Sequence, residues 1–357
     1  MTSDIGETTP NDVTTGNSPE PETSEQAPAP DGDALASLLK RAENYEEPKG
    51  SSGADLPPFT AADYSDFITG SGADKLADSG VPPLVAAARG YKRLDSTNFA
   101  TEMRLMNIKM STKQGKRLQR SLNGPGNDGM QMPWFSLADI QDAEKKDIVC
   151  LPFTHQIRPG RPENNDQGKP VKYESLAGVG RPLDSHSSVP AAWIDKTPIV
   201  MIAEGLLKGD SALTSYLHKH GASWDALRDG SEGASDRLKK LLKTIPADDR
   251  ILILSIAGIN NTTQNPVDWR SIELRGREAW IAFDADLDSN IHVWRAAARL
   301  WEELETREKV DRVRLLSPKV AVNAGIEKAG VDDFLAKLDQ RPAGAPPRNR
   351  PELPEPH

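Results

Sequence analysis

Four carboxylates in the second half of the chain stand at the ends of short apolar runs, and these are Glu204, Asp284, Asp286 and Asp288. Glu204 follows residues 198–203, and the three aspartates follow residues 278–283. Side chains at alternate positions of an extended chain point to the same side, so Asp284 and Asp286 can converge on one point. Mg²⁺ is held in this way by one or two carboxylates together with waters and substrate phosphates. The residues therefore predict a site for Mg²⁺ or Mn²⁺.

These apolar runs belong to a region, from residue 196 onward, in which runs of strand length alternate with helical patterns. The runs cover residues 198–203, 250–258, 278–283 and 313–318, and the helical patterns lie at about 210–219, 233–243, 290–308 and 332–338. Nearly continuous apolar strands that alternate with helices are typical of an α/β fold, with a mostly parallel sheet covered by helices on both faces. Functional groups in such sheets lie at the carboxyl ends of the strands. We therefore expect Glu204 to face the aspartates, where it would bind a second ion or act as general acid or base.

An acidic residue after a strand also has an ordinary structural use, as the N-cap of the following helix. Asp288 precedes a predicted helix and fits either role. Gly205 permits close backbone approach directly after Glu204. Several carboxylates at two strand ends, together with this glycine, favour the metal site over capping alone.

The order of these segments resembles the Toprim domain, the metal-binding catalytic fold of bacterial-type primases, topoisomerases and certain nucleases. The segments that carry the resemblance are IVMIAEGLLKGDSAL, IAFDADLDSNIHVWRAAARLWEEL and AGVDDFLAK, preceded by LADSGVPPLVAAARGY and KPVKYES. They are similar in particular to Toprim-like proteins of phages, plasmids and integrated mobile elements, which often accompany a replicative helicase. The resemblance covers most of residues 74–338 and implies a Toprim (Rossmann-like) fold.

The resemblance also implies roles for individual residues. Glu204 corresponds to the Toprim glutamate, which acts as general acid or base, and Asp284 and Asp286 correspond to the Mg²⁺ ligands. Lys208 stands where many Toprim domains have an acidic residue, and we expect it to meet a phosphate in the catalytic site.

The sequence departs from the Toprim pattern in its spacing. Asp210 is displaced by two positions from the usual acidic residue, and 80 positions separate Glu204 from Asp284, which predicts a helical insertion at about 221–245. Asp332 and Asp333 match the terminal acidic pair of the family. They also open a predicted helix, where capping is the ordinary role.

The region before residue 196 mixes helical patterns, such as 74–90, with short apolar runs, and this predicts a small α+β region. It contains a stretch without acidic residues, whose cations are Arg104, Lys109, Lys113, Lys116, Arg117 and Arg120. A second, more diluted group includes Arg158, Arg161 and Lys172. Both groups are candidates for contacts with a nucleic-acid backbone, and a solvated helix face is the alternative. Trp134 and Phe135 fit either base stacking or the core of a small β element.

The net charge of −9 arises entirely from the first 60 residues, which hold twelve acidic and three basic residues. Their composition predicts a disordered acidic leader over 1–55, and the Pro-dense end predicts a disordered tail over 340–357. Between them we expect an α+β region at 56–195, which is a candidate for nucleic-acid binding, and a Toprim-like domain at 196–339. The single Cys150 excludes an internal disulfide framework and a multi-cysteine zinc site, and it predicts a small buried residue. No membrane span or signal peptide is expected, which favours the cytoplasm.

These observations and the resemblance together predict a DNA replication protein of a mobile element or phage. It would carry out Mg²⁺-dependent nucleotidyl or phosphoryl transfer in the manner of a primase, on single-stranded DNA or a primer-template, with a replicative helicase as a further partner. Two alternatives stay open at this point. One is a non-catalytic nucleic-acid-binding accessory module of a replication complex, and the other is a Toprim-type nuclease.

Overall fold

The computed structural model describes residues 59–124, 126–176, 179–180, 182–258, 269, 271–283 and 291–316. Several sequence predictions lie outside these residues. They are the acidic leader, the Pro-rich tail, the helix at 332–338 and the acidic residues Asp284, Asp286, Asp288, Asp332 and Asp333.

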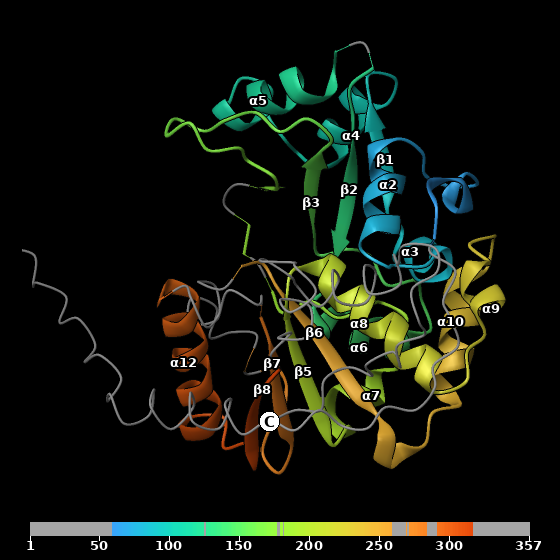
Figure 1. Ribbon diagram of the computed structural model, residues 1–357, viewed down its shortest axis with the longest axis vertical. Helices are drawn as coiled ribbons and strands as arrows, with labels where there is room; N and C mark the ends of the chain where they lie inside the picture. The colour runs from blue at the N-terminus through green and yellow to red at the C-terminus, as the bar shows by residue number, and fades with distance from the viewer. Residues whose placement is uncertain are drawn as a thin grey trace, which may run out of the picture.

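The second half of the described chain forms a mixed α/β unit around a parallel sheet (Figure 1). Its strands are β5 (Ile199–Glu204), β6 (Ile251–Ile256), β7 (Glu278–Ala282) and β8 (Arg312–Leu316), in the order β6-β5-β7-β8. All three neighbouring pairs are parallel. The prediction of a mostly parallel sheet is confirmed, and the finer assignment to the Toprim fold stays a prediction.

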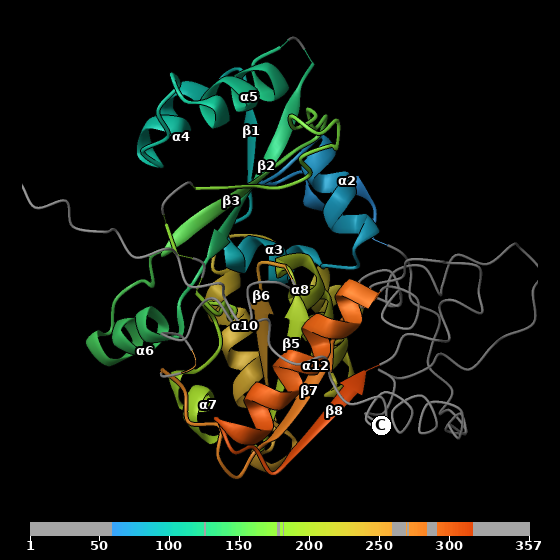
Figure 2. The same cartoon turned by 90° about the vertical axis from the view of Figure 1, so that its left-hand side faces the viewer.

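Helices cover both faces of this sheet. The connection from β5 to β6 contains α8 (Leu206–Lys219), α9 (Trp224–Arg228), α10 (Ala234–Lys243) and the short 3-10 helix η2 (Ala247–Asp249), and the connection from β7 to β8 contains α12 (Ile291–Thr306). The two crossovers run in opposite directions along the sheet, and right-handed crossovers of opposite direction lie on opposite faces. Figures 1 and 2 accordingly place α8 and α12 on opposite sides of the strands.

The strands form because their apolar residues are buried on both faces. In β5 the four residues from Val200 to Ala203 are each at most 1% exposed, and only the ends of the strand reach solvent. Gly205 then turns the chain into α8 with φ 89°, a conformation that side-chain-bearing residues rarely adopt. Helix α8 begins at Leu206, directly after Gly205 and four residues earlier than the sequence pattern indicates.

The first half of the described chain forms an antiparallel sheet, which lies above the parallel one in Figure 1. Its strands are β1 (Lys92–Asp95), β2 (Asp128–Trp134), β3 (Thr154–Pro159) and β4 (Glu174–Ser175), in sequential order. The accompanying helices are η1 (Ala61–Tyr64), α2 (Ser71–Asp78), α3 (Pro83–Arg89), α4 (Phe99–Leu105), α5 (Lys113–Leu122), α6 (Leu137–Lys146) and α7 (Ala191–Lys196).

Two details differ from the sequence predictions in this half. The pattern at 74–90 forms the two helices α2 and α3, because Gly80 has φ 63° and Pro82 and Pro83 follow it. The short apolar run at 147–153 forms a loop, and the side chain of Val149 is 80% exposed. Cys150 in this loop is half-buried, so the prediction of a fully buried cysteine is wrong.

The two halves are joined by residue 184. Asp184 bridges Ser136, just after β2, and also bridges Ser255 of β6, whose backbone it pairs with through hydrogen bonds of 3.0 and 2.7 Å. One hydrophobic core includes residues of both halves, such as Met132 and Ile202. A second, smaller core lies beneath α4 and α5 and contains Leu118 and Leu122 of α5.

Candidate functional site

Glu204 lies at the place where the direction of the parallel sheet's crossovers changes. Strand β5 has β6 on one side and β7 on the other, and its own crossover leads to β6 while that of β7 leads away to β8. In open α/β sheets the carboxyl ends of the strands at such a switch point form the usual ligand site. Ala203 of β5 pairs in register with Ala282 of β7, so Glu204 is level with Phe283, the residue bonded to Asp284.

The surroundings of Glu204 combine a carboxylate, a cation and a helix start. The Glu204 side chain is 25% exposed, and its Oε2 atom lies 3.9 Å from the Nζ atom of Lys208, one turn into α8. The backbone N–H of Gly205 donates to the carbonyl of Ile256 at 2.8 Å, which fixes the end of β5 against the end of β6. The structure therefore brings the two predicted catalytic residues, Glu204 and Lys208, together at the predicted edge.

Only part of the predicted metal site can be placed. Within the described residues there is no group of three or more His, Cys, Asp or Glu side chains with the spacing of a metal site. Glu204 is the described member of the predicted set, and its carboxylate oxygens are the hard donors that Mg²⁺ prefers. The positive charge of Lys208, 3.9 Å from this carboxylate, competes with a second metal ion for its oxygens.

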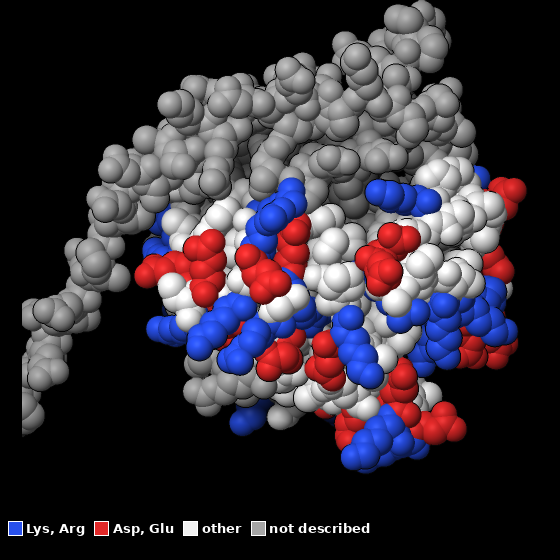
Figure 3. Space-filling view, turned by 90° about the horizontal axis from the view of Figure 1, so that it is seen from below, with Lys and Arg blue, Asp and Glu red and all other residues white. Residues whose placement is uncertain are grey.

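The end of the antiparallel sheet faces this edge. Trp134 of β2, Thr154 and His155 of β3, and Ala257, just after β6, line one small pocket of about 10 Å³. The Oγ1 atom of Thr154 is buried and has no hydrogen-bond partner among the described residues. Burial lowers the pKa of His155, so its ring stays neutral over more of the pH range than a free histidine. The opposite edge of the parallel sheet, seen from below in Figure 3, carries basic and acidic side chains interspersed.

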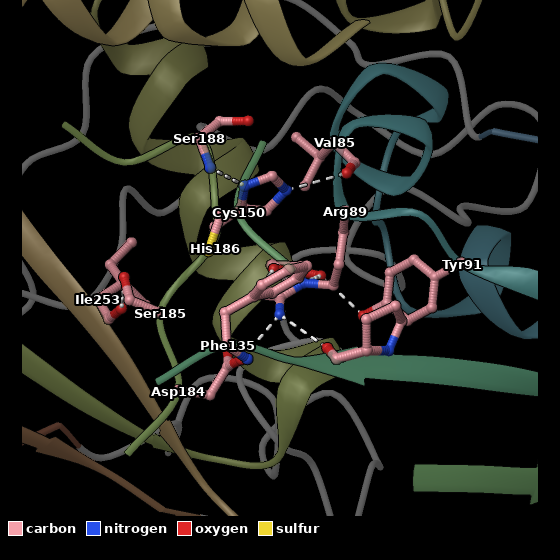
Figure 4. A network of polar contacts seen from close by, with 12 residues as sticks. Val85, Arg89, Tyr91, Phe135, Cys150, Asp184, Ser185, His186, Ser188 and Ile253 are labelled. Carbon is pink, nitrogen blue, oxygen red and sulfur yellow. Dashed lines mark hydrogen bonds and ion pairs between the residues drawn. The ribbon is translucent and has the colours of Figure 1, made fainter. Parts of the chain in front are cut away.

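A buried polar network lies between the two halves, and sequence analysis did not predict it (Figure 4). Arg89 at the end of α3 donates from Nε and Nη2 to the two carboxylate oxygens of Asp210, each at 2.7 Å. Its Nη1 atom donates to Asp184 at 3.0 Å and to the carbonyl of Pro133. The hydroxyl of Tyr91 also donates to Asp210 at 2.7 Å. All of these side chains are buried, so the network ties α3, α8 and the segment around residue 184 to one another.

The ionisation of this network follows from burial and charge. Burial raises the pKa of Asp184 to about 7, although Arg89 and the backbone N–H of Phe135 oppose the rise. The pKa of Arg89 is raised by its two carboxylate neighbours against its own burial. Burial and the charge of Arg89 lower the pKa of His186 to about 4.

The hydrogen bonds of His186 assign its tautomer. Its Nδ1 atom accepts from the backbone N–H of Ser188 at 3.1 Å, and its Nε2 atom lies 3.1 Å from the carbonyl of Val85. Nδ1 must therefore be unprotonated, and Nε2 carries the hydrogen. Protonation of Nδ1 would place its N–H against the backbone N–H of Ser188.

The role of Asp210 is thus settled by its contacts. Its carboxylate accepts three hydrogen bonds from Arg89 and Tyr91 and is 1% exposed, which is the environment of a structural ion pair. Arg89, Tyr91 and Asp184 were not candidates from the sequence, because nothing in their local patterns distinguishes them from surface residues.

The basic stretch at 104–120 divides into two groups. Lys113, Arg117 and Arg120 share one face of α5 and pair with acidic residues of the segment that follows β3, namely Asp166, Glu174 and Glu163, respectively. Arg104, Lys109 and Lys116 are exposed and form no ion pair with any acidic residue that the structure describes. The second group is the better candidate for contacts with phosphates.

The remaining candidates lie in β3 and in the segment between β3 and β4. The guanidinium of Arg158 lies over the ring of Tyr173, at 5.8 Å from its centroid, and Arg161 and Lys172 are exposed. Trp134 and Phe135 are 2% and 3% exposed, so they belong to the core and are not a stacking platform.

Comparison of the chain with protein-family models, with curated proteins and with solved structures found no match. No helix among the described residues is both long and apolar enough to cross a membrane.

Proposed function

We propose that the protein is a Toprim-like enzyme of DNA replication that carries out Mg²⁺-dependent nucleotidyl or phosphoryl transfer on nucleic acid. The observation that carries the proposal is the register of β5 and β7. It sets Glu204 level with Phe283, and Phe283 is bonded directly to the first predicted metal ligand, Asp284. Consecutive Cα atoms are about 3.8 Å apart, so Asp284 begins within one residue of the level of Glu204.

Each candidate residue has a distinct task in this proposal. Asp284 and Asp286 would hold Mg²⁺, with Asp288 as a further candidate ligand, and the bound ion would stabilise charge on a phosphoryl group. Glu204 would accept a proton from the attacking hydroxyl or water, and Lys208, 3.9 Å from it, would contact a phosphate oxygen. The same arrangement serves a primase with a primer hydroxyl as nucleophile and a nuclease with water.

The test is the incorporation of labelled nucleotide on single-stranded DNA with Mg²⁺ or Mn²⁺, with DNA cleavage assayed in parallel. We expect Glu204→Gln to reduce whichever of the two reactions is observed by about 10²–10⁴-fold, the usual contribution of a general acid or base. Asp284→Asn should also reduce it, because the substitution removes a proposed ligand of the metal ion. Asp142→Asn is the matched control, because it alters an exposed carboxylate that is paired only with Lys146 of the same helix. Activity that Asp284→Asn leaves unchanged would refute the metal site.

A non-catalytic accessory module is the second candidate, and the pairing of Lys208 with Glu204 favours it. A cation bound to the only described carboxylate of the site reduces that carboxylate's capacity to accept a proton. Absence of both reactions, with binding of single-stranded DNA retained, would establish this second candidate instead.

A further inference from the structure

We propose that the pocket between α4 and α5 binds a nucleotide unit, with the base against its apolar floor and the phosphate against Arg104 and Lys109. The pocket has a volume of about 380 Å³, within the range of small-molecule sites. Its lining residues come mostly from α4, α5 and the segment between them, and these two helices lie in the upper half of Figure 2, beside the antiparallel sheet. The choice of ligand rests on the proposed nucleic-acid chemistry, whereas the pocket itself is separate from the edge that carries Glu204.

The lining of the pocket divides into an apolar floor and a polar rim. Phe99, Met103 and Ile108 form the buried part of the floor and are 4%, 1% and 9% exposed, and Met110 is partly exposed. The exposed rim contains Ser96, Arg104, Asn107, Lys109, Gln119 and Asn123. The rim therefore has two cations, several amides and no carboxylate.

This combination matches a nucleotide. A base has an apolar face and hydrogen-bonding edges, which suit the floor and the amides, and its phosphate suits the cations. A purely apolar ligand would leave the rim without partners. An acidic peptide would satisfy the cations but does not require an apolar floor.

Local structure holds the two cations on the pocket. Helix α4 ends with a hydrogen bond of 2.8 Å from the N–H of Ile108 to the carbonyl of Met103, and Asn107 has φ 55° at this turn. This is a common way to end a helix, and Asn is one of the few residues that tolerate the left-handed conformation. The turn places Arg104 before it and Lys109 after it on the same pocket.

The close approach of α5 forms the other wall. A Cβ atom at Gly115 would lie 2.3 Å from the carbonyl oxygen of Lys109 and 2.7 Å from the Cα atom of Met110, so only glycine fits at this position. The side chain of Thr112 accepts a hydrogen bond of 3.0 Å from the N–H of Gly115 and caps the helix against the same segment.

The geometry of α5 separates the pocket face from the paired face. Residues three or four apart on a helix are neighbours, so Lys116, Gln119 and Asn123 form one row. Lys113, Arg117 and Arg120 form the row that faces the acidic segment after β3. Lys116 therefore extends the cationic character of the pocket along the helix, as a single strand that continues from the bound nucleotide would require.

The test is equilibrium binding of a labelled oligodeoxythymidylate to the full chain in EDTA, so that the outcome does not depend on the metal site. We expect Arg104→Ala/Lys109→Ala to weaken binding about tenfold or more and to reduce the slope of log affinity against log salt by about 0.7, the value for one phosphate contact with a single strand. The control Lys240→Ala/Lys243→Ala removes two exposed cations from α10. Equal weakening by the two double variants would overturn the proposal, as would undiminished binding by Arg104→Ala/Lys109→Ala.

Two competitors test the base and the source of the nucleotide. An abasic strand of the same length should compete at least about tenfold less well than the thymidine strand, because stacking of each base contributes about 1–3 kcal/mol. Equal competition would contradict the role of the floor. Displacement of the strand by thymidine monophosphate would show that a free nucleotide is sufficient to fill the pocket. Failure of the monophosphate to compete would show that the pocket binds a nucleotide only as one unit of a single strand.

Discussion

Replacement of Asp210 by Asn tests whether the buried network holds the two halves of the molecule together. Asp210 accepts hydrogen bonds of 2.7 Å from two nitrogens of Arg89 and from the hydroxyl of Tyr91, and both Arg89 and Asp210 are about 1% exposed. Asparagine has the same shape as aspartate but no charge. Its NH₂ group would replace one carboxylate oxygen and would face the N–H or O–H groups of Arg89 and Tyr91 that now donate to that oxygen. Arg89 would then keep only Asp184 as a charged partner.

The expected cost follows from the burial of the pair. Removal of one partner of a buried ion pair costs about 3–5 kcal/mol, because the other charge stays buried without compensation. An exposed pair contributes less than about 1 kcal/mol. Asp142, whose pair with Lys146 has side chains 56% and 58% exposed, respectively, provides the matched control.

The assay is urea unfolding at pH 7, followed by tryptophan fluorescence and circular dichroism. We expect Asp210→Asn to lower the free energy of unfolding by about 3–5 kcal/mol and Asp142→Asn to lower it by less than about 1 kcal/mol. A cycle with Arg89→Gln should give a coupling energy of at least about 0.5 kcal/mol, because the two residues are in contact. A cost below about 1 kcal/mol for Asp210→Asn would refute the structural role.

Two further predictions concern pH and packing. The pKa of His186 is lowered to about 4, so the stability that this residue contributes is complete above pH 6.5 and is lost as the pH falls towards 4. His186→Gln should therefore remove about 3 kcal/mol of the loss of stability between pH 6.5 and pH 4. The raised pKa of Asp184 changes the stability in the opposite direction over the same pH interval. The quantity to measure is therefore the difference between the free energies of unfolding of wild type and His186→Gln as a function of pH. Parallel pH profiles would exclude the effect. Gly115→Ala should lower the free energy of unfolding by about 1–3 kcal/mol despite the higher helix propensity of alanine, because the added Cβ would meet backbone atoms. An unchanged urea midpoint would contradict the close approach of α5 to residues 109 and 110.

The parallel sheet was predictable because its signal is local. Strands such as β5 and β6 are short apolar runs, and the helices between them have a clear amphipathic pattern, so their order and type follow from the sequence. The position of Glu204 at the carboxyl end of β5 followed from the same pattern. The first half was harder to predict, because β1 has the sequence KRLD and β4 has two residues, and neither carries a hydrophobic period.

The buried network could not be predicted because its members are far apart in the sequence. Arg89 and Asp210 are 121 residues apart, and each stands in a helix whose pattern fits a solvent-exposed position equally well. A buried charge is recognisable only when its partner is known to be adjacent, which is a property of the tertiary fold. The same limit applies to the basic stretch, where the pairing of Arg117 with Glu174 depends on how the segment after β3 returns to α5.

The network also holds α8, the helix that follows the proposed catalytic edge. Glu204 precedes this helix, Lys208 lies in its first turn and Asp210 follows in the next turn, where Arg89 holds it. A displacement of α3 relative to the parallel sheet would therefore pull on Asp210 and move Lys208, which shares α8 with it, relative to Glu204 at the end of β5. We expect Arg89 to act as a positioning residue for the edge of the parallel sheet, since its ion pair with Asp210 fixes the helix that presents Lys208.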